Sequence, residues 1–234
     1  MYPTEYFYAY NFNRQGQLIS SFETRKDDGT ADTTWNEYIY DNEGSLIEHK
    51  QGNSTSKSST IYHLDDKKRV ISEEYLTETI DSTGKKAVVL MNSESMSYED
   101  FGLQHKKTVL NSYGLPYKTE LSFYDESGYL LEQEERFSRT SNFNKTLYTY
   151  NDKGLLASIA VHQKGIATPV EENKFKYDQY GNITEKHWYK NGTFTTDTQI
   201  VYNEQTKLMT AVIIRDVSTN FLMVIRFGDY EYFD

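Results

Sequence analysis

The chain has 234 residues, a formal net charge of −10, 15% aromatic residues and no cysteine. The missing cysteines exclude disulfides and thiolate metal sites, and the negative charge argues against nucleic acid, whose phosphates are bound by clustered Lys and Arg. No apolar run approaches the ~20 residues of a membrane-spanning helix. The 21 tyrosines and 12 phenylalanines instead favour many half-exposed β-strands and argue against disorder.

One short motif recurs along the chain. An aromatic or apolar anchor is followed by Asp or Asn, by Gly four residues after the anchor, and by Leu or Ile two residues later. Successive anchors lie 28, 24, 34, 26, 26, 27 and 25 residues apart. A near-constant period of this length is typical of stacked supersecondary units. The eight anchors are Phe12, Tyr40, Leu64, Tyr98, Tyr124, Tyr150, Tyr177 and Tyr202.

Each position of the motif has a role in a β-hairpin. The anchor and the residue two before it lie on one face of a strand, and the Asp or Asn side chain caps the turn that follows. Gly supplies the positive φ that such loops require, and the Leu or Ile resumes the buried face. The residues that carry these roles are Tyr40, Asp41, Gly44, Leu46, Tyr124, Asp125, Gly128, Leu130, Tyr150, Gly154, Leu156, Tyr177, Asp178, Gly181, Ile183 and Tyr202.

A second turn is predicted midway through most units, so that each unit has two strands. Asn191-Gly192 is the strongest of these turns, because this dipeptide is typical of two-residue hairpin loops. Lys68 and Thr206 stand where Gly is expected, and we predict a different turn type at both places. The other midway turns are expected at 26–29, 51–53, 111–114 and 163–165.

These patterns predict an all-β fold in one domain, 1–234. It is a long antiparallel β-meander of about eight hairpin repeats, with 16 to 18 strands and almost no helix, because no segment shows sustained helical periodicity. We expect the meander to twist or curl into an open shell or solenoid. The 34-residue interval predicts a longer hairpin at about 72–97, and the apolar run 221–227 predicts capping strands at about 220–234.

The motif resembles the YD, or RHS, repeat of bacterial cell-surface and secreted proteins. The segments 40–46, 124–130 and 177–183 match it, those at Tyr150 and Tyr202 have Asn for Asp, and the other three depart further. The chain is also similar to small uncharacterised surface or periplasmic proteins of this kind. The resemblance implies a β-meander and an exported protein whose leader lies outside this sequence. Large members enclose a toxic domain in a shell, a role for which eight units are too few.

The sequence predicts no catalytic residue, metal site or cofactor. None of the five histidines has a partner at ligand spacing, and no nucleophile elbow, phosphate loop or dinucleotide fingerprint occurs. Carboxylates are plentiful, at 132–135 and 171–172 for example. A glycosidase needs two of them facing each other about 5–10 Å apart, an arrangement that the sequence leaves open.

Three aromatic residues outside the anchor register are the candidate binding residues: Trp35, Trp188 and Tyr189. Exposed rings on a flat sheet stack on sugars or grip partner proteins. We therefore expect a non-enzymatic secreted, periplasmic or cell-surface repeat protein that presents a broad sheet to an unknown protein or glycan. The alternatives are a glycan-active protein, either a carbohydrate-binding module or a hydrolase, and a shell fragment of a larger RHS-type toxin.

Overall fold

The structure is a computed structural model that describes residues 5–27, 30–80, 84–140 and 143–232. These residues form seventeen β-strands and no helix, and every recorded strand pair is antiparallel and joins neighbours in the chain. The prediction of an all-β antiparallel meander with 16 to 18 strands is therefore confirmed. The chain divides into two compact units. Unit 1 contains 1–97 and 109–116, and unit 2 contains 98–108 and 117–234.

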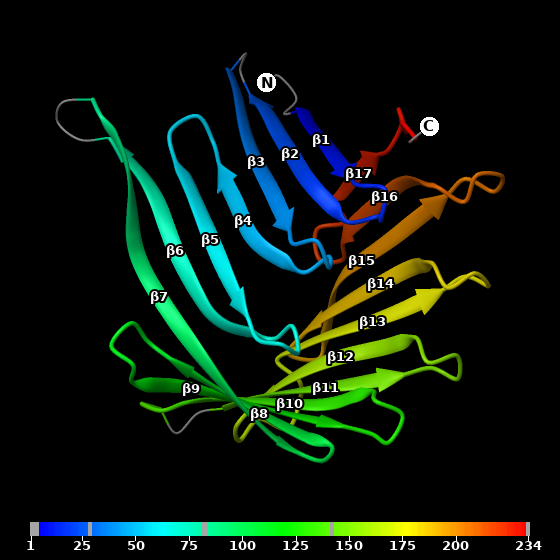
Figure 1. Cartoon of the computed structure of the whole chain (residues 1–234). Helices are drawn as coiled ribbons and strands as arrows, with labels where there is room; N and C mark the ends of the chain where they lie inside the picture. Colours follow the sequence, from blue (N-terminus) through cyan, green and yellow to red (C-terminus); the bar gives the residue numbers. More distant parts are fainter. Residues whose placement is uncertain (1–4, 28–29, 81–83, 141–142, 233–234) are drawn as a thin grey trace. The chain divides into compact units, whose positions relative to one another are not determined.

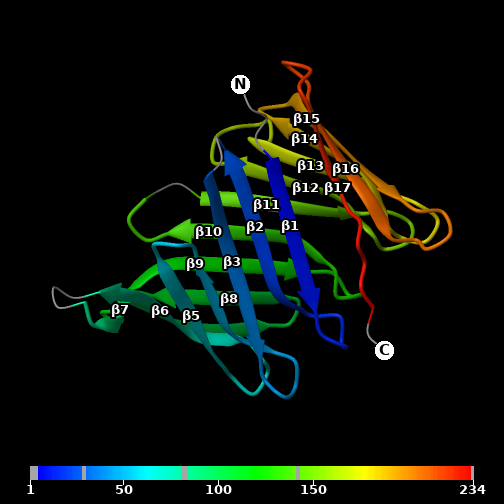
Figure 2. The same ribbon diagram turned by 90° about the horizontal axis from the view of Figure 1, so that it is seen from above.

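Unit 1 is an open sheet in which each strand pairs with the next. Figure 1 shows these strands in sequence from dark blue to green, and Figure 2 shows the same sheet from above. Among the described strands β7 is the longest, with 16 residues, and its last four residues belong to unit 2. The strands are β1 (Glu5–Phe12), β2 (Leu18–Asp27), β3 (Thr30–Tyr40), β4 (Leu46–Gly52), β5 (Lys57–Leu64), β6 (Val70–Ile80) and β7 (Lys86–Phe101).

Unit 2 repeats this arrangement, with β9 to β17 paired in chain order. Strand β17 is shorter than the capping strands predicted at 220–234, and 227–232 have no regular secondary structure. The strands are β8 (Gln104–Leu110), β9 (Pro116–Tyr124), β10 (Leu130–Phe137), β11 (Phe143–Tyr150), β12 (Leu156–Gln163), β13 (Glu171–Tyr177), β14 (Ile183–Lys190), β15 (Thr193–Tyr202), β16 (Met209–Asp216) and β17 (Leu222–Arg226).

Most side chains on the sheets are at least partly exposed to solvent. Within the described residues only Met96, Val109 and Ala160 are buried hydrophobic residues. The accessible surface area is 16190 Å², against about 11,000 Å² for a compact protein of this mass. Stability must therefore come from strand pairing, turns and half-buried side chains in a single layer, because a packed interior contributes little.

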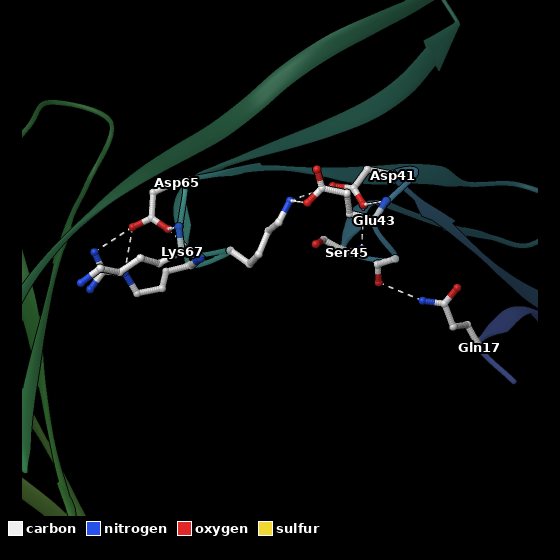
Figure 3. Close-up of polar contacts among 9 residues, drawn as sticks. Gln17, Asp41, Glu43, Ser45, Asp65 and Lys67 are labelled. Carbon is white, nitrogen blue, oxygen red and sulfur yellow. Dashed lines mark hydrogen bonds and ion pairs between the residues drawn. The ribbon is translucent and has the colours of Figure 1, made fainter. Parts of the chain in front are cut away.

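The repeated turn has one hydrogen-bond pattern, which Asp41 illustrates. Its Oδ1 accepts the backbone N–H groups of Glu43 (2.9 Å) and Ser45 (2.8 Å), and its own N–H donates to the Ser45 carbonyl (2.9 Å) (Figure 3). Gly44, at φ +83°, donates its N–H to the Asp41 carbonyl. The bond from Ser45 is the main reason why the pKa of Asp41 is lowered. The same pattern occurs at Asn13, Asp65, Asn111, Asp125, Asn151 and Asp178.

The prediction of a different turn at Lys68 is wrong. Lys68 takes φ +64° in the glycine position and the turn keeps all the bonds of the Asp41 turn. Its ammonium forms ion pairs with Glu43 and with Asp41 of the neighbouring turn, the latter at 3.8 Å, which gives a reason for lysine at a strained position. The prediction holds for the last repeat. There the loop is one residue longer, and Lys207, not Thr206, has positive φ.

The midway turns also divide into two kinds. Asn191 and Gly192, at φ 49° and 76°, form the predicted two-residue loop. The turn at 111–115 lies where a midway turn was predicted but has the hydrogen bonds of the repeat motif, with Leu110 as its anchor and Asn111 as its cap. At Tyr98, which was predicted as an anchor, the strand runs on to Phe101, and Gly102 (φ 64°) lies in the connection to β8.

The anchor tyrosines make a contact that the motif alone did not indicate. The Tyr177 hydroxyl donates to the Leu156 carbonyl at 2.7 Å, so the anchor of one repeat bonds the residue that resumes the strand in the preceding repeat. We call this contact the tyrosine clasp. It also occurs near the C-terminus, where Tyr230 donates to Met209. The other clasps join Tyr40 to Leu18 (2.9 Å), Tyr150 to Leu130 (2.9 Å) and Tyr202 to Ile183 (3.0 Å).

Candidate functional site

An aromatic row runs along β1 of unit 1. Tyr6, Tyr8, Tyr10 and Phe12 alternate with other residues, so their side chains share one face of the strand. Tyr6, Tyr10 and Phe12 are 46–48% exposed. The rings of Tyr6 and Tyr8 are nearly parallel, with centroids 6.4 Å apart and planes 12° apart. The row is therefore a narrow aromatic platform open to solvent.

Polar groups flank the row on the same face. Strand β2 places Arg25, Glu23 and Ser21 opposite Tyr6, Tyr8 and Tyr10. Desolvation, and next the charge of Glu23, raise the pKa of the Tyr8 hydroxyl, so this phenol is neutral at physiological pH.

Further along the same face, hydrogen bonds hold the polar groups in place. Asn36 on β3 donates to the Ser21 hydroxyl at 3.2 Å, and its Oδ1 lies 2.9 Å from His49 Nε2. The His49 ring stacks on Tyr38 with centroids 4.7 Å apart. The aromatic row thus lies beside polar side chains that are held in place by hydrogen bonds. This arrangement suits a ligand with an apolar face and polar edges.

The three predicted binding residues do not form one surface. Trp35 is half-buried on the face of unit 1 opposite to the aromatic row, and its ring covers Gly52, where an added Cβ would lie 2.9 Å from Cζ2. Trp188, in unit 2, is half-buried between Asn173 and Thr196. Tyr189 points to the other face of β14, because successive side chains alternate.

Tyr189 belongs instead to a mixed aromatic and cationic group. Its ring lies 5.2 Å from that of Phe194, and Lys174 Nζ lies 4.8 Å from its centroid. Trp35, Trp188 and Tyr189 are thus three separate positions. The aromatic row was missed because only Tyr10 and Phe12 entered the anchor register, although the alternation from Tyr6 to Phe12 was visible in the sequence.

A charged cluster on β13–β16 brings two carboxylates to one histidine. His187 Nε2 lies 3.1 Å from Glu185 and 3.4 Å from Asp197. Lys176 pairs with Glu185 at 2.7 Å, and Arg215 pairs with Asp197 at 3.1 Å. The hydrogen bond from Lys176 is the main cause that lowers the pKa of Glu185, so this carboxyl is ionised at neutral pH. The carboxylates of Glu185 and Asp197 are therefore both held in ion pairs.

The surroundings of this cluster are shallow. Asp197 is only 9% exposed, while Asp197, Gln199, Ile213, Arg215 and Leu222 line a depression of about 270 Å³. In the described residues no group of three His, Cys, Asp or Glu side chains has a geometry that holds a metal ion. Nor does this part of the chain contain a helix with the length and apolarity to cross a bilayer.

Comparisons with known proteins give limited matches. The model of a family described as an uncharacterised protein matches residues 137–223. No curated protein matches this chain. Among solved structures, a porin-like protein from Bacteroides uniformis has a TM-score of 0.47 at 9% identity, over 93% of this chain and 90% of its own.

Two further similar structures are complexes of TcdB2-TccC3. TcdB2-TccC3-TEV has a TM-score of 0.32 at 11% identity and covers 94% of this chain. TcdB2-TccC3-Cdc42 has a TM-score of 0.23 at 11% identity and covers 95% of this chain. The match spans 14% and 17% of the length of those chains.

Proposed function

We propose that this is a non-enzymatic, exported protein that binds an extended glycan along the aromatic row of β1. The observation that carries the proposal is the row itself, in which Tyr6, Tyr10 and Phe12 are exposed on one face of one strand and the rings of Tyr6 and Tyr8 are nearly parallel. A sugar ring has an apolar face of C–H groups and polar hydroxyls at its edges. The apolar face would stack on Tyr6, Tyr8 and Tyr10, and the hydroxyls would reach the polar groups of β2.

The surroundings favour a sugar over an apolar peptide. Residues Ser21, Glu23 and Arg25 border the rings, and such groups stay solvated against a hydroxyl-rich ligand but lose hydration against apolar side chains. The net charge of −10 also favours a neutral glycan over a polyanion. A secreted, periplasmic or cell-surface location is part of the proposal and agrees with the absence of cysteine.

The hydrolase alternative would depend on Glu185 and Asp197. Both carboxylates are paired with cations, and only Asp197 borders the shallow depression. A general acid needs a raised pKa, whereas that of Glu185 is lowered. No observation favours the toxin-shell alternative over the binding protein.

Isothermal titration against soluble neutral polysaccharides, such as mannan, xyloglucan and amylopectin, tests the proposal. Each of Tyr6→Ala and Tyr10→Ala should weaken binding about 2- to 10-fold, since one aromatic contact contributes about 0.5–1.5 kcal/mol. Phe7→Ala is the matched control, because Phe7 lies on the same strand, is 57% exposed and points to the opposite face. Tyr113→Ala, at an 86% exposed turn position, is the second control.

Two results would overturn the proposal. One is the absence of binding to every polysaccharide in the panel. The other is an equal loss of affinity in Phe7→Ala and Tyr10→Ala, which would place the ligand away from the row.

A further inference from the structure

The face of unit 1 that carries the aromatic row continues across the sheet as two rows of uncharged polar side chains, which we call the neutral rows. Residues directly opposite each other in neighbouring antiparallel strands place their side chains on the same face. The first row crosses β1 to β6 and consists of Tyr10, Ser21, Asn36, Gln51, Ser58 and Thr77. The second row crosses β3 to β7 and consists of Tyr38, His49, Thr60, Tyr75 and Asn92.

Charges on these strands are sorted away from the neutral rows. Of all residues in the chain 26% are charged, yet no row position holds Asp, Glu, Lys or Arg. Burial lowers the pKa of His49, so its ring is neutral at neutral pH. On the opposite face of the same strands, Lys50 forms ion pairs with Glu37 (3.9 Å) and Glu48 (3.5 Å). Charged residues would solvate an exposed face as well as neutral ones do, so their exclusion from the rows indicates a particular ligand chemistry.

The rows offer hydrogen-bonding groups and a flat ring surface. The side chains of Gln51, Ser58 and Thr77 form no hydrogen bond within the described part of the chain, so their donors and acceptors are open to a ligand. In the second row the rings of Tyr38 and His49 are stacked with planes 2° apart. Neighbouring strands lie about 4.8 Å apart, so the first row measures roughly 24 Å from β1 to β6. This length has room for a chain of several sugars.

This chemistry favours a neutral, hydroxyl-rich chain over the other ligand classes. A charged ligand would lose hydration on the rows without gaining an opposite charge there. An apolar peptide or a lipid would meet no aliphatic side chain among the row residues and would leave their polar groups without partners.

We propose that the glycan site continues from Tyr10 across β2 to β6, and that its ligand is an uncharged saccharide chain of several sugars that lies across these strands. The inference rests on the proposed function, glycan binding at the aromatic row. It adds a second arm to that site and names the class of glycan. The sugar hydroxyls bond the Ser, Thr, Asn and Gln side chains of the first row, and a ring at the start of this arm stacks on Tyr10.

Isothermal titration with oligosaccharides of increasing length tests this extension. The probes are manno-oligosaccharides, xyloglucan oligosaccharides and malto-oligosaccharides, from about two sugars, which cover only the aromatic row, to about six, which also reach the first neutral row. In the series that binds, the long probe should bind at least about tenfold more tightly than the short one, because it adds several hydrogen bonds along the row.

Two serines next to each other on β5 give a matched pair of variants. Ser58→Ala should weaken binding of the long probe about 2- to 10-fold, and Gln51→Ala combined with Ser58→Ala about 10-fold or more, while the short probe binds as before. Ser59→Ala is the control and should change neither affinity, because Ser59 points to the opposite face. Circular dichroism of each variant checks that its strand content is retained.

The outcomes separate this inference from the proposed function. A long probe that binds no more tightly than the short one would overturn the second arm and leave the aromatic row as the site, and equal losses in Ser58→Ala and Ser59→Ala would do the same. Unchanged affinity for a carboxymethylated form of the bound polysaccharide would overturn the neutral ligand class. Absence of binding by every short and long probe would refute the proposed function and this inference together.

Discussion

Removing one tyrosine clasp should destabilise the protein by a predictable amount. The Tyr177 hydroxyl donates to the Leu156 carbonyl at 2.7 Å, and Tyr177→Phe deletes only this oxygen. The ring and its packing remain, so the loss is that of one hydrogen bond in a half-buried place, about 1 kcal/mol. The Leu156 carbonyl is then left to water, which keeps the loss at the lower end of the range for unsatisfied groups.

Urea unfolding followed by far-ultraviolet circular dichroism measures this loss. With a slope of about 2–3 kcal/mol per molar urea, a change of about 1 kcal/mol lowers the midpoint by roughly 0.3–0.5 M. Tyr180→Phe is the control, because Tyr180 lies on the following turn, is 60% exposed and has no clasp. Its midpoint should change by less than about 0.2 M.

Combining clasps makes the test stricter. Tyr150, Tyr177 and Tyr202 bond three different carbonyls in unit 2. Their losses should therefore add, to about 3 kcal/mol in the triple Phe variant. A triple variant as stable as the wild-type chain would refute the view that these hydroxyls hold successive repeats together.

Two further predictions concern the turns. Gly154→Ala should destabilise the protein more than Gly128→Ala. Both glycines have positive φ, +75° and +86°, but only at Gly154 would the new Cβ collide with a side chain, at the Tyr129 hydroxyl. Equal midpoints in urea would contradict this prediction. Bonds from Ser218 and Thr219 lower the pKa of Asp216 to about 2, so its stabilising effect is complete above an unfolded pKa of about 4 and is lost as the pH falls through about 2. Asp216→Asn should flatten this part of the acid dependence of the melting temperature, and an unchanged acid profile would show that the turn does not respond to this carboxylate.

The turns were predictable from sequence because their chemistry is local. Asp41 accepts N–H groups two and four residues ahead of it, so its role lies within five residues of the chain. Lys68 departs from the motif because Glu43 and Asp41, more than twenty residues earlier, pair with its ammonium. No local pattern contains that information.

The same limit explains why the candidate site could not be predicted from the sequence. The pairing of Tyr6 with Arg25, and of Trp35 with Gly52, depends on strand register, which the motif specifies only near the turns. Adjacent aromatic residues such as Trp188 and Tyr189 look like one feature in a sequence, yet in a strand they face opposite sides of the sheet. A strand-by-strand reading of alternation would have separated them and would have found the row on β1.

The tyrosine clasps have a consequence for how such a chain changes its length over evolution. Each clasp reaches back only 19 to 22 residues, from an anchor to the strand just before it. Each clasped unit thus carries a tyrosine hydroxyl that donates to the previous unit and a backbone carbonyl that accepts from the next unit. Duplication or deletion of a whole unit leaves every remaining hydroxyl with a carbonyl, whereas loss of a single strand leaves one unmatched. Homologous chains should therefore differ in size by whole units of about 26 residues.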